Sequence, residues 1–259
     1  MLADKKIMKH LLDKLFADKE REQVYPPYYL NQIYKMQRKF GSKFCDFDKR
    51  SNLAEYAHWC SEWGWCIFDE LSEVLGWLPW KHWKDYSAYT PEKVEVQFEL
   101  IDILHFAVSL NMTADVRPAH IMEYVEAKED TLPAILVAIK GSFMLSTGID
   151  LPIIKEEDRY FQTKMAIARI NDEVAWLQDK ESLLEKTDIT STSQIIKVEE
   201  LRKKVAVRAL EIFRQLVVLL LLWDMSAEDI WNYYAAKNKE NHDRQKRGYA
   251  ETNIVLGPE

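Results

Sequence analysis

Glycine, proline and cysteine are scarce in this chain of 259 residues, which has 7 Gly, 8 Pro and 3 Cys. So few turn-forming residues argue against a turn-rich β-protein. Hydrophobic residues make up 47% of the chain and charged residues 30%, a composition that favours helices. The length is sufficient for one large domain or two small ones, either with a proper core. We therefore expect an all-α fold, a multi-helix bundle.

The three cysteines, Cys45, Cys60 and Cys66, are odd in number and show no Cys-x-x-Cys spacing. This pattern indicates neither a disulfide framework nor a zinc knuckle. We expect reduced and mostly buried thiols, as in a cytoplasmic protein.

Long hydrophobic runs and an excess of positive charge are also missing. The longest apolar run, 216–223, is too short to cross a bilayer, and the charged N-terminus lacks the apolar core of a signal peptide. The chain has 35 basic and 42 acidic residues, a net charge of −7. This balance excludes a general nucleic-acid binder, although a local basic cluster could still hold a small phosphate compound. We expect neither a membrane nor a nucleic acid as partner.

Hydrophobic periodicity and the few Gly and Pro residues predict helices along most of the chain. The predicted helices cover residues 4–22, 28–40, 52–77, 91–111, 118–147 with a break at Pro133, 155–186, 194–223 and 226–248. We interpret residues 1–259 as a single domain, with 1–25 as an N-terminal helical extension and 250–259 as a C-terminal tail.

Two pairs of acidic residues stand out in this pattern: Glu70 with Glu73, and Glu99 with Asp102. Residues three apart lie on the same side of a helix, so each pair shares one face. From Phe98 to Leu110 all other residues are apolar or small except His105 and Ser109, which lie on that same face. Carboxylates on buried helices are costly unless they are paired or bind metal. All-oxygen ligands suit Mg²⁺ first, and Mn²⁺ or Ca²⁺ next.

The alternative is that these acids are simply solvated, which is the usual fate of an acid on a helix. With 42 acidic residues in the chain, pairs at this spacing also arise by chance. The apolar flanks of both pairs argue against this alternative because they leave little room for a solvated face.

A short aromatic and basic segment, Trp80-Lys81-His82-Trp83-Lys84, follows the first acidic pair. Trp80 and Trp83 could stack on a base while Lys84 holds phosphate. The alternative is a plain amphipathic turn with lysine side chains lying along it.

The last predicted helix places Lys237, Asn241 and Arg244 on one face. Lysine and arginine suit phosphate, and an Asn amide can read a base or sugar edge. A solvated basic helix end is the alternative. Ser226 with Asp229 three residues later predicts a capping box at the start of this helix.

Three motifs together resemble the all-α nucleotide pyrophosphatases, specifically the dimeric dUTPases and the phage-type dCTP/dUTP diphosphatases. The first is Glu70-x-x-Glu73 followed by Glu99-x-x-Asp102 and His105-Phe106, and the second is the tryptophan–lysine segment. The third runs from Lys237 through Asn241 and Arg244 to Tyr249. Their order and spacing are specific in combination, although each alone is weak.

The resemblance implies Mg²⁺-dependent hydrolysis of dUTP, and of dUDP as a further substrate, to dUMP by a homodimer, which would limit uracil in DNA. It implies that Glu70, Glu73, Glu99 and Asp102 hold two or more Mg²⁺ ions, or Mn²⁺, and that Glu70 accepts the proton of the attacking water. The implied substrate-binding residues are Gln37, Trp80, Trp83, Lys84, His105, Phe106, Lys237, Asn241, Arg244 and Tyr249. We interpret His105 as a supporting or structural group, since it lies between two apolar neighbours.

One position departs from this family pattern. The similar dUTPases carry Asn one turn after the glutamine that corresponds to Gln37, and here that position is Gly41. The resemblance therefore implies hydrolysis more directly than a preference for uracil, and a broader dCTP/dUTP diphosphatase is the alternative.

The sequence leaves two alternative classes of protein. A di-iron carboxylate bundle would use Glu-x-x-His pairs such as Glu55 with His58. That pair lies about 22 Å along the helix from Glu70 and Glu73, too far to share a metal pair. A helical scaffold without turnover is the second alternative, and the presence of all four acids together with the basic motif argues against it.

Overall fold

The computed structural model describes residues 29–47, 53–81, 83–86, 89–127, 156–185 and 191–247. Within these ranges all regular structure is helical, which confirms the all-α fold class. The helices are α2 (Tyr29–Gly41), α3 (Leu53–Gly76), α4 (Lys93–Thr113), α5 (Pro118–Ala127), α7 (Glu156–Glu185), α8 (Thr192–Leu222) and α9 (Ala227–Arg247). The predicted helix 4–22, the break at Pro133, the N-terminal extension 1–25 and the tail 250–259 lie outside the described residues.

Most observed helix ends fall within two residues of the predicted ones, and local contacts explain them. Helix α8 begins before residue 194 because Ser191 is its N-cap, with the side chain accepting a hydrogen bond from the backbone N–H of Gln194. Helix α4 continues to Thr113, where Asp115 adopts a left-handed backbone conformation with φ of 60°. The predicted capping box is confirmed: Asp229 accepts from the backbone N–H of Ser226, and Ser226 accepts from that of Asp229, at 2.8 and 3.1 Å.

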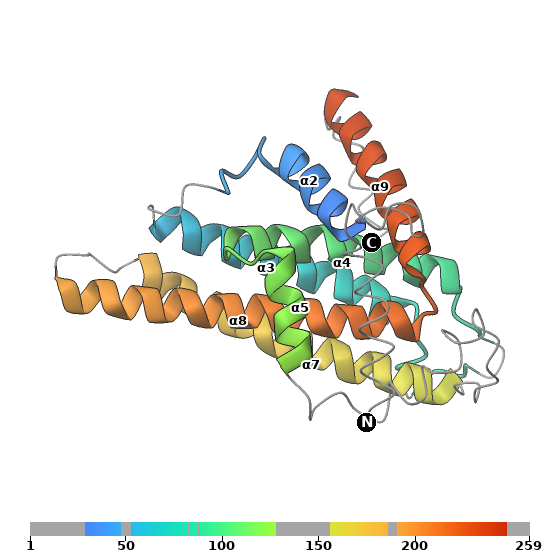
Figure 1. Ribbon diagram of the computed structural model, residues 1–259. Helices are drawn as coiled ribbons and strands as arrows, with labels where there is room; N and C mark the ends of the chain where they lie inside the picture. The colour runs from blue at the N-terminus through green and yellow to red at the C-terminus, as the bar shows by residue number, and fades with distance from the viewer. Residues whose placement is uncertain are drawn as a thin grey trace, which may run out of the picture.

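Four long helices form the body of the molecule (Figure 1). Helix α3 packs on α4 and α7, and α8 packs on α4 and α7, so that the four surround a common core. Helices α2 and α9 pack against each other and against α4, on the side of the bundle away from α7 and α8 (Figure 1). Helices α2, α3 and α9 therefore all pack against α4.

The core of the bundle is densest along the second half of α8. Every residue from Ile212 to Trp223 is buried. Burial of the aliphatic side chains in this segment stabilises the bundle, because each contributes about 1.5–3 kcal/mol. The longest apolar run of the sequence, 216–223, therefore lies in the core.

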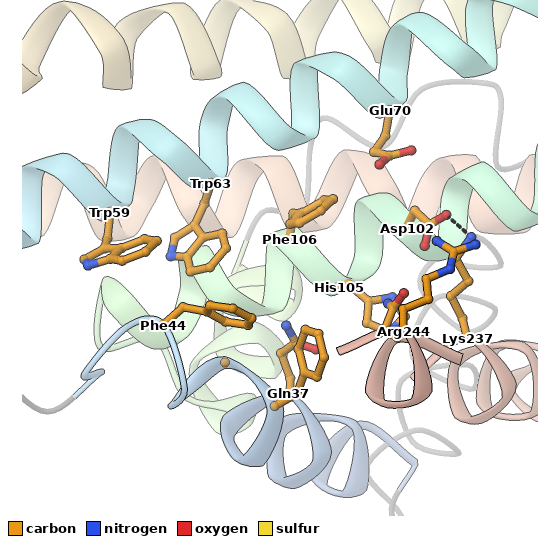
Figure 2. A pocket seen from close by; sticks show the side chains of 13 residues that line it. Gln37, Phe44, Trp59, Trp63, Glu70, Asp102, His105, Phe106, Lys237 and Arg244 are labelled. Atoms are coloured by element: carbon orange, nitrogen blue, oxygen red, sulfur yellow. Dashed lines mark ion pairs between the residues drawn. The ribbon is translucent and has the colours of Figure 1, made fainter. Parts of the chain in front are cut away.

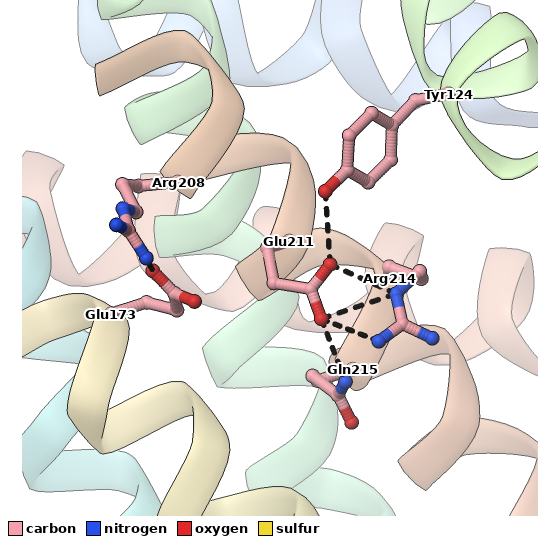
Figure 3. Close-up of polar contacts among 6 residues, drawn as sticks. All are labelled: Tyr124, Glu173, Arg208, Glu211, Arg214 and Gln215. Carbon is pink, nitrogen blue, oxygen red and sulfur yellow. Dashed lines mark hydrogen bonds and ion pairs between the residues drawn. The ribbon is translucent and has the colours of Figure 1, made fainter. Parts of the chain in front are cut away.

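A polar cluster interrupts this core and is almost fully paired (Figure 3). The carboxylate of Glu211 accepts hydrogen bonds from the guanidinium of Arg214, from Gln215 at 2.9 Å and from the hydroxyl of Tyr124 on α5 at 3.0 Å. Nearby, Arg208 on α8 forms an ion pair with Glu173 on α7 at 2.6 Å. The charges inside this part of the bundle are compensated by opposite charges and donors.

The three cysteines are free; Cys45 and Cys60 are buried and Cys66 is half-buried. Burial raises the pKa of the Cys60 thiol to about 12, so the thiol remains protonated at neutral pH. Among the described helices none is long and apolar enough to span a membrane.

Candidate active site

The carboxylates of Glu70, Glu73 and Glu99 meet where α3 faces α4. One oxygen from each lies within 4.8 Å of the others. Glu70 and Glu99 are half-buried, whereas Glu73 is exposed. The indole N–H of Trp77 donates a hydrogen bond to Glu99 at 3.3 Å. Three hard oxygen donors at this separation form a site that a divalent cation could occupy.

The electrostatics of this cluster are unfavourable when it holds no cation. Burial, together with the negative charges of Asp102, Glu73 and Glu99, raises the pKa of Glu70 to about 8. Burial also raises the pKa of Glu99. Carboxylates that resist ionisation in this way gain stability from a nearby positive charge.

Asp102 lies beside the three glutamates and has a cationic partner on another helix. Its carboxylate contacts the ammonium group of Lys237 on α9 at 2.6 Å (Figure 2). Burial raises the pKa of Asp102, and the contact with Lys237 opposes that rise. Burial alone lowers the pKa of Lys237, but the hydrogen bond and charge of Asp102 raise it overall, so the lysine stays charged. Of the four predicted metal ligands, three form the compact cluster and the fourth is held by a lysine.

A cavity of about 390 Å³ opens from this acidic end. Helices α2, α3, α4 and α9 all contribute to its lining (Figure 2). Its polar end carries Glu70 and Asp102 together with Lys237, Asn241 and Arg244. Acidic and basic side chains that face one space suit a ligand with both bound metal and phosphate groups.

The other end of the cavity is aromatic. The rings of Trp59 and Trp63 stack with centroids 5.1 Å apart, and Trp63 and Phe106 stack at 6.3 Å. Phe40 and Phe44 complete this end from α2 and the turn after it. Flat, offset rings of this kind are well suited to stack against a planar base.

A buried polar wall separates the two ends. Gln37 from α2 and His105 from α4 line the cavity, with 3% and 4% of their surfaces exposed. His105 stacks on Tyr234 of α9 with centroids 4.0 Å apart, and burial lowers its pKa to about 4, so the imidazole is neutral. Its Nδ1 lies 2.8 Å from the carbonyl oxygen of Ile101, which can only accept, so Nδ1 carries the proton.

Comparison with known families agrees with this geometry. A family model described as dUTPase matches residues 29–249. The chain belongs to the all-α dUTPase family. Members of this family are dUTP diphosphatases, hydrolases of phosphoanhydride bonds that generally depend on divalent metal ions, and the chain is an enzyme of this class. A search of curated proteins finds no match.

Within this dUTPase, the predicted residues divide into two groups. The pocket brings together Gln37, Glu70, Asp102, His105, Phe106, Lys237, Asn241 and Arg244. Trp80, Trp83 and Lys84 do not line it; they are exposed, with Trp83 at 64%, and lie in the connection between α3 and α4. Their role in substrate binding stays a prediction. Tyr249 lies outside the described residues.

Several lining residues of this dUTPase were not predicted as site residues. Trp59 and Trp63 precede Glu70 by 11 and 7 residues, about three and two helical turns. That spacing puts them on the same face of α3 as Glu70, a signal the sequence did contain. Phe44 carried no such signal, because it lies in a turn after α2 and reaches the cavity only through the tertiary fold.

Proposed function

We propose that this enzyme hydrolyses dUTP to dUMP and pyrophosphate with Mg²⁺ as its metal, and that dUDP is a further substrate. The observation that carries the proposal is a single cavity with Asp102, Glu70 of the carboxylate cluster and two basic side chains at one end and aromatic rings at the other. A nucleoside triphosphate has the same division, with a charged chain and a planar base.

The metal proposal rests on the donor set and its charge. The three glutamates offer only oxygen atoms, and the raised pKa of Glu70 reflects repulsion that a divalent cation would relieve. Two or more Mg²⁺ ions, with Mn²⁺ as a substitute, would be held by these glutamates together with Asp102. When bound, such ions neutralise phosphate charge and lower the pKa of a coordinated water.

The protein's own groups supply the remaining steps. Glu70 accepts the proton of the attacking water, because it is the glutamate of the cluster that lines the cavity. Lys237 and Arg244 bind the phosphate oxygens from α9. The aromatic end excludes water from the base, and Asn241, which also lines the cavity, binds the sugar or the edge of the base.

A second candidate, hydrolysis of both dCTP and dUTP, is supported by Gly41. This residue lines the cavity, and a Cβ atom added there would lie 2.7 Å from Cζ of Phe47. A larger side chain would therefore require the ring of Phe47 to move. The cavity wall has no polar side chain at this position to contribute to base recognition.

The direct test is incubation of the purified protein with each dNTP and MgCl₂, followed by separation of products. We expect dUMP and pyrophosphate from dUTP, and loss of turnover with EDTA that Mg²⁺ restores. Loss of dUTP with little loss of dCTP supports the first candidate, and comparable loss of both supports the second. Absence of hydrolysis of every nucleotide would overturn the proposal. We further propose a homodimer on the basis of the family resemblance, and light scattering tests it.

A further inference from the structure

We infer that Ser109 is a positioning residue that fixes the side-chain amide of Gln37 in one orientation and thereby sets the choice between uracil and cytosine. This inference rests on the proposed function, since it assigns the base end of the same cavity. The evidence is a chain of hydrogen bonds among side chains that are almost completely buried.

The hydroxyl group of Ser109 has a single proton, and its position follows from its neighbours. Ser109 Oγ lies 3.0 Å from the carbonyl oxygen of His105, which can only accept, so the proton is directed there. Toward Gln37, at 2.9 Å, Ser109 can then only accept. The Gln37 atom that faces Ser109 is therefore the nitrogen Nε2, and the oxygen Oε1 faces the other way.

The opposite side of the amide agrees with this assignment. The hydroxyl of Tyr234 lies 2.7 Å from Gln37 Oε1 and donates to it. Ser109 and Tyr234 are both completely buried, so neither hydroxyl can turn to solvent for another partner. The amide of Gln37 keeps one unused N–H and one unused lone pair, and Gln37 lines the cavity.

Counting hydrogen bonds shows which hydroxyl holds the amide. The observed orientation has three bonds, from Gln37 to Ser109, from Ser109 to His105 and from Tyr234 to Gln37. With the amide flipped, Ser109 must turn its proton to Gln37 and lose its bond to the His105 carbonyl, so one bond is lost. Without the Ser109 hydroxyl the two orientations form one bond each, because a tyrosine hydroxyl can either donate or accept. Without the Tyr234 hydroxyl, the observed orientation keeps its advantage of one bond.

The orientation matters because the two pyrimidines differ at the edge that an amide can read. Uracil has a donor at N3 beside an acceptor oxygen, and cytosine has an acceptor at N3 beside a donor amino group. Flipping a glutamine amide exchanges its donor and acceptor. A fixed amide therefore favours one base, and an amide free to flip accepts both.

His105 adds a second fixed group to this wall. Its Nδ1 carries the proton, so Nε2 is an acceptor, and it is buried without a hydrogen-bond partner. An unpaired buried acceptor at the edge of a cavity is costly unless a bound molecule donates to it. Gln37 and His105, which both line the cavity, therefore have hydrogen-bonding groups of fixed donor and acceptor character.

The test compares Ser109→Ala and Tyr234→Phe with Ser61→Ala as control. Ser61 is a completely buried serine on α3 that does not line the cavity. The measurement is the ratio of kcat/KM for dUTP to that for dCTP, with the melting temperature of each variant. We expect Ser109→Ala to move this ratio about tenfold toward one, the usual effect of one buried hydrogen bond. Tyr234→Phe should keep the ratio within about threefold of wild type, because its amide remains oriented.

Calorimetric binding of dUMP and dCMP repeats the comparison without turnover. Selective binding that Ser109→Ala abolishes, in a protein that hydrolyses neither triphosphate, would support this inference and overturn the proposed function. An unchanged ratio in folded Ser109→Ala would overturn the inference and leave the hydrolase proposal intact. The same conclusion follows if wild type does not distinguish the two bases, or if Tyr234→Phe shifts the ratio as much as Ser109→Ala.

Discussion

Two groups of charged side chains lie between the helices of this protein, and they are arranged in opposite ways. Around Glu211 on α8, the carboxylate is surrounded by a guanidinium, an amide and a hydroxyl. Between α3 and α4, Glu70, Glu73 and Glu99 face one another, and the nearest positive group, Lys237, is bound to Asp102. The negative charge of the first cluster is compensated within the chain, whereas that of the second is not.

This difference separates a structural role from a functional one. A paired internal charge needs nothing further, and breaking it destabilises the fold. A cluster of like charges destabilises the fold by itself and persists where a ligand compensates for it, which is why strongly shifted pKa values concentrate at functional sites. Mutation of the two clusters should therefore affect different properties.

Glu70→Gln should have the largest effect on activity. An amide cannot accept the water proton and binds Mg²⁺ more weakly, so we expect kcat to fall by about 10²- to 10⁴-fold. The melting temperature without metal should stay the same or rise, because the change removes one of the repelling charges. Steady-state hydrolysis of dUTP and thermal unfolding measure these two effects. Glu62→Gln, an exposed glutamate on the same helix, is the matched control and should change neither.

Glu73→Gln tests the exposed member of the acidic cluster. We expect it to abolish Mg²⁺-dependent turnover with little change in helix content by circular dichroism. Retention of most activity would remove Glu73 from the proposed set of metal ligands.

Glu211→Gln should have the reverse effect. It leaves the guanidinium of Arg214, only 6% exposed, without its counter-charge, and removal of one partner of a buried ion pair typically costs about 3–5 kcal/mol. Denaturant unfolding should show this loss, while kcat per folded molecule stays near wild type. A variant of normal stability, or one that folds normally but is inactive, would contradict the division between the two clusters.

Lys237→Met removes the ion pair between Lys237 and Asp102, which compensates one acid beside the otherwise unpaired cluster. The side chain contacts Asp102 and also lines the cavity, so its loss should remove a phosphate ligand. We expect about a tenfold fall in kcat/KM, carried mainly by KM for dUTP, because a charge-assisted hydrogen bond contributes roughly 1.5–3 kcal/mol. Lys239→Met, an exposed lysine on the same helix, is the control. An unchanged KM would show that Lys237 serves Asp102 alone.

The sequence predicted the parts of the site that lie within single helices. The acidic pairs follow from spacing on α3 and α4, because helical geometry fixes which residues share a face. The contact between Asp102 and Lys237 joins α4 to α9 across 135 residues, and no local pattern specifies such a pairing. The inward orientation of Trp59 was missed for a related reason: an aromatic side chain on a helix can face a core or a cavity, and only the packing of α2 decides between them.

The pH dependence of stability tests the unpaired cluster in the metal-free protein. The pKa of Glu70 rises from 4.5 to about 8 on folding, so between these values the folded state binds more protons than the unfolded state. Stability without metal should therefore fall as the pH rises through this window, and should not fall further above it. Mg²⁺ binds the ionised form of Glu70, so saturating MgCl₂ should flatten the decline of stability with pH. The variant Glu70→Gln should lack the part of this decline that Glu70 contributes. Thermal unfolding from pH 5 to 8.5, with EDTA or with MgCl₂, measures both effects. A metal-free protein whose stability rises across this range, or a slope that Mg²⁺ leaves unchanged, would mean that the acids at α3 and α4 are as well compensated as those on α8.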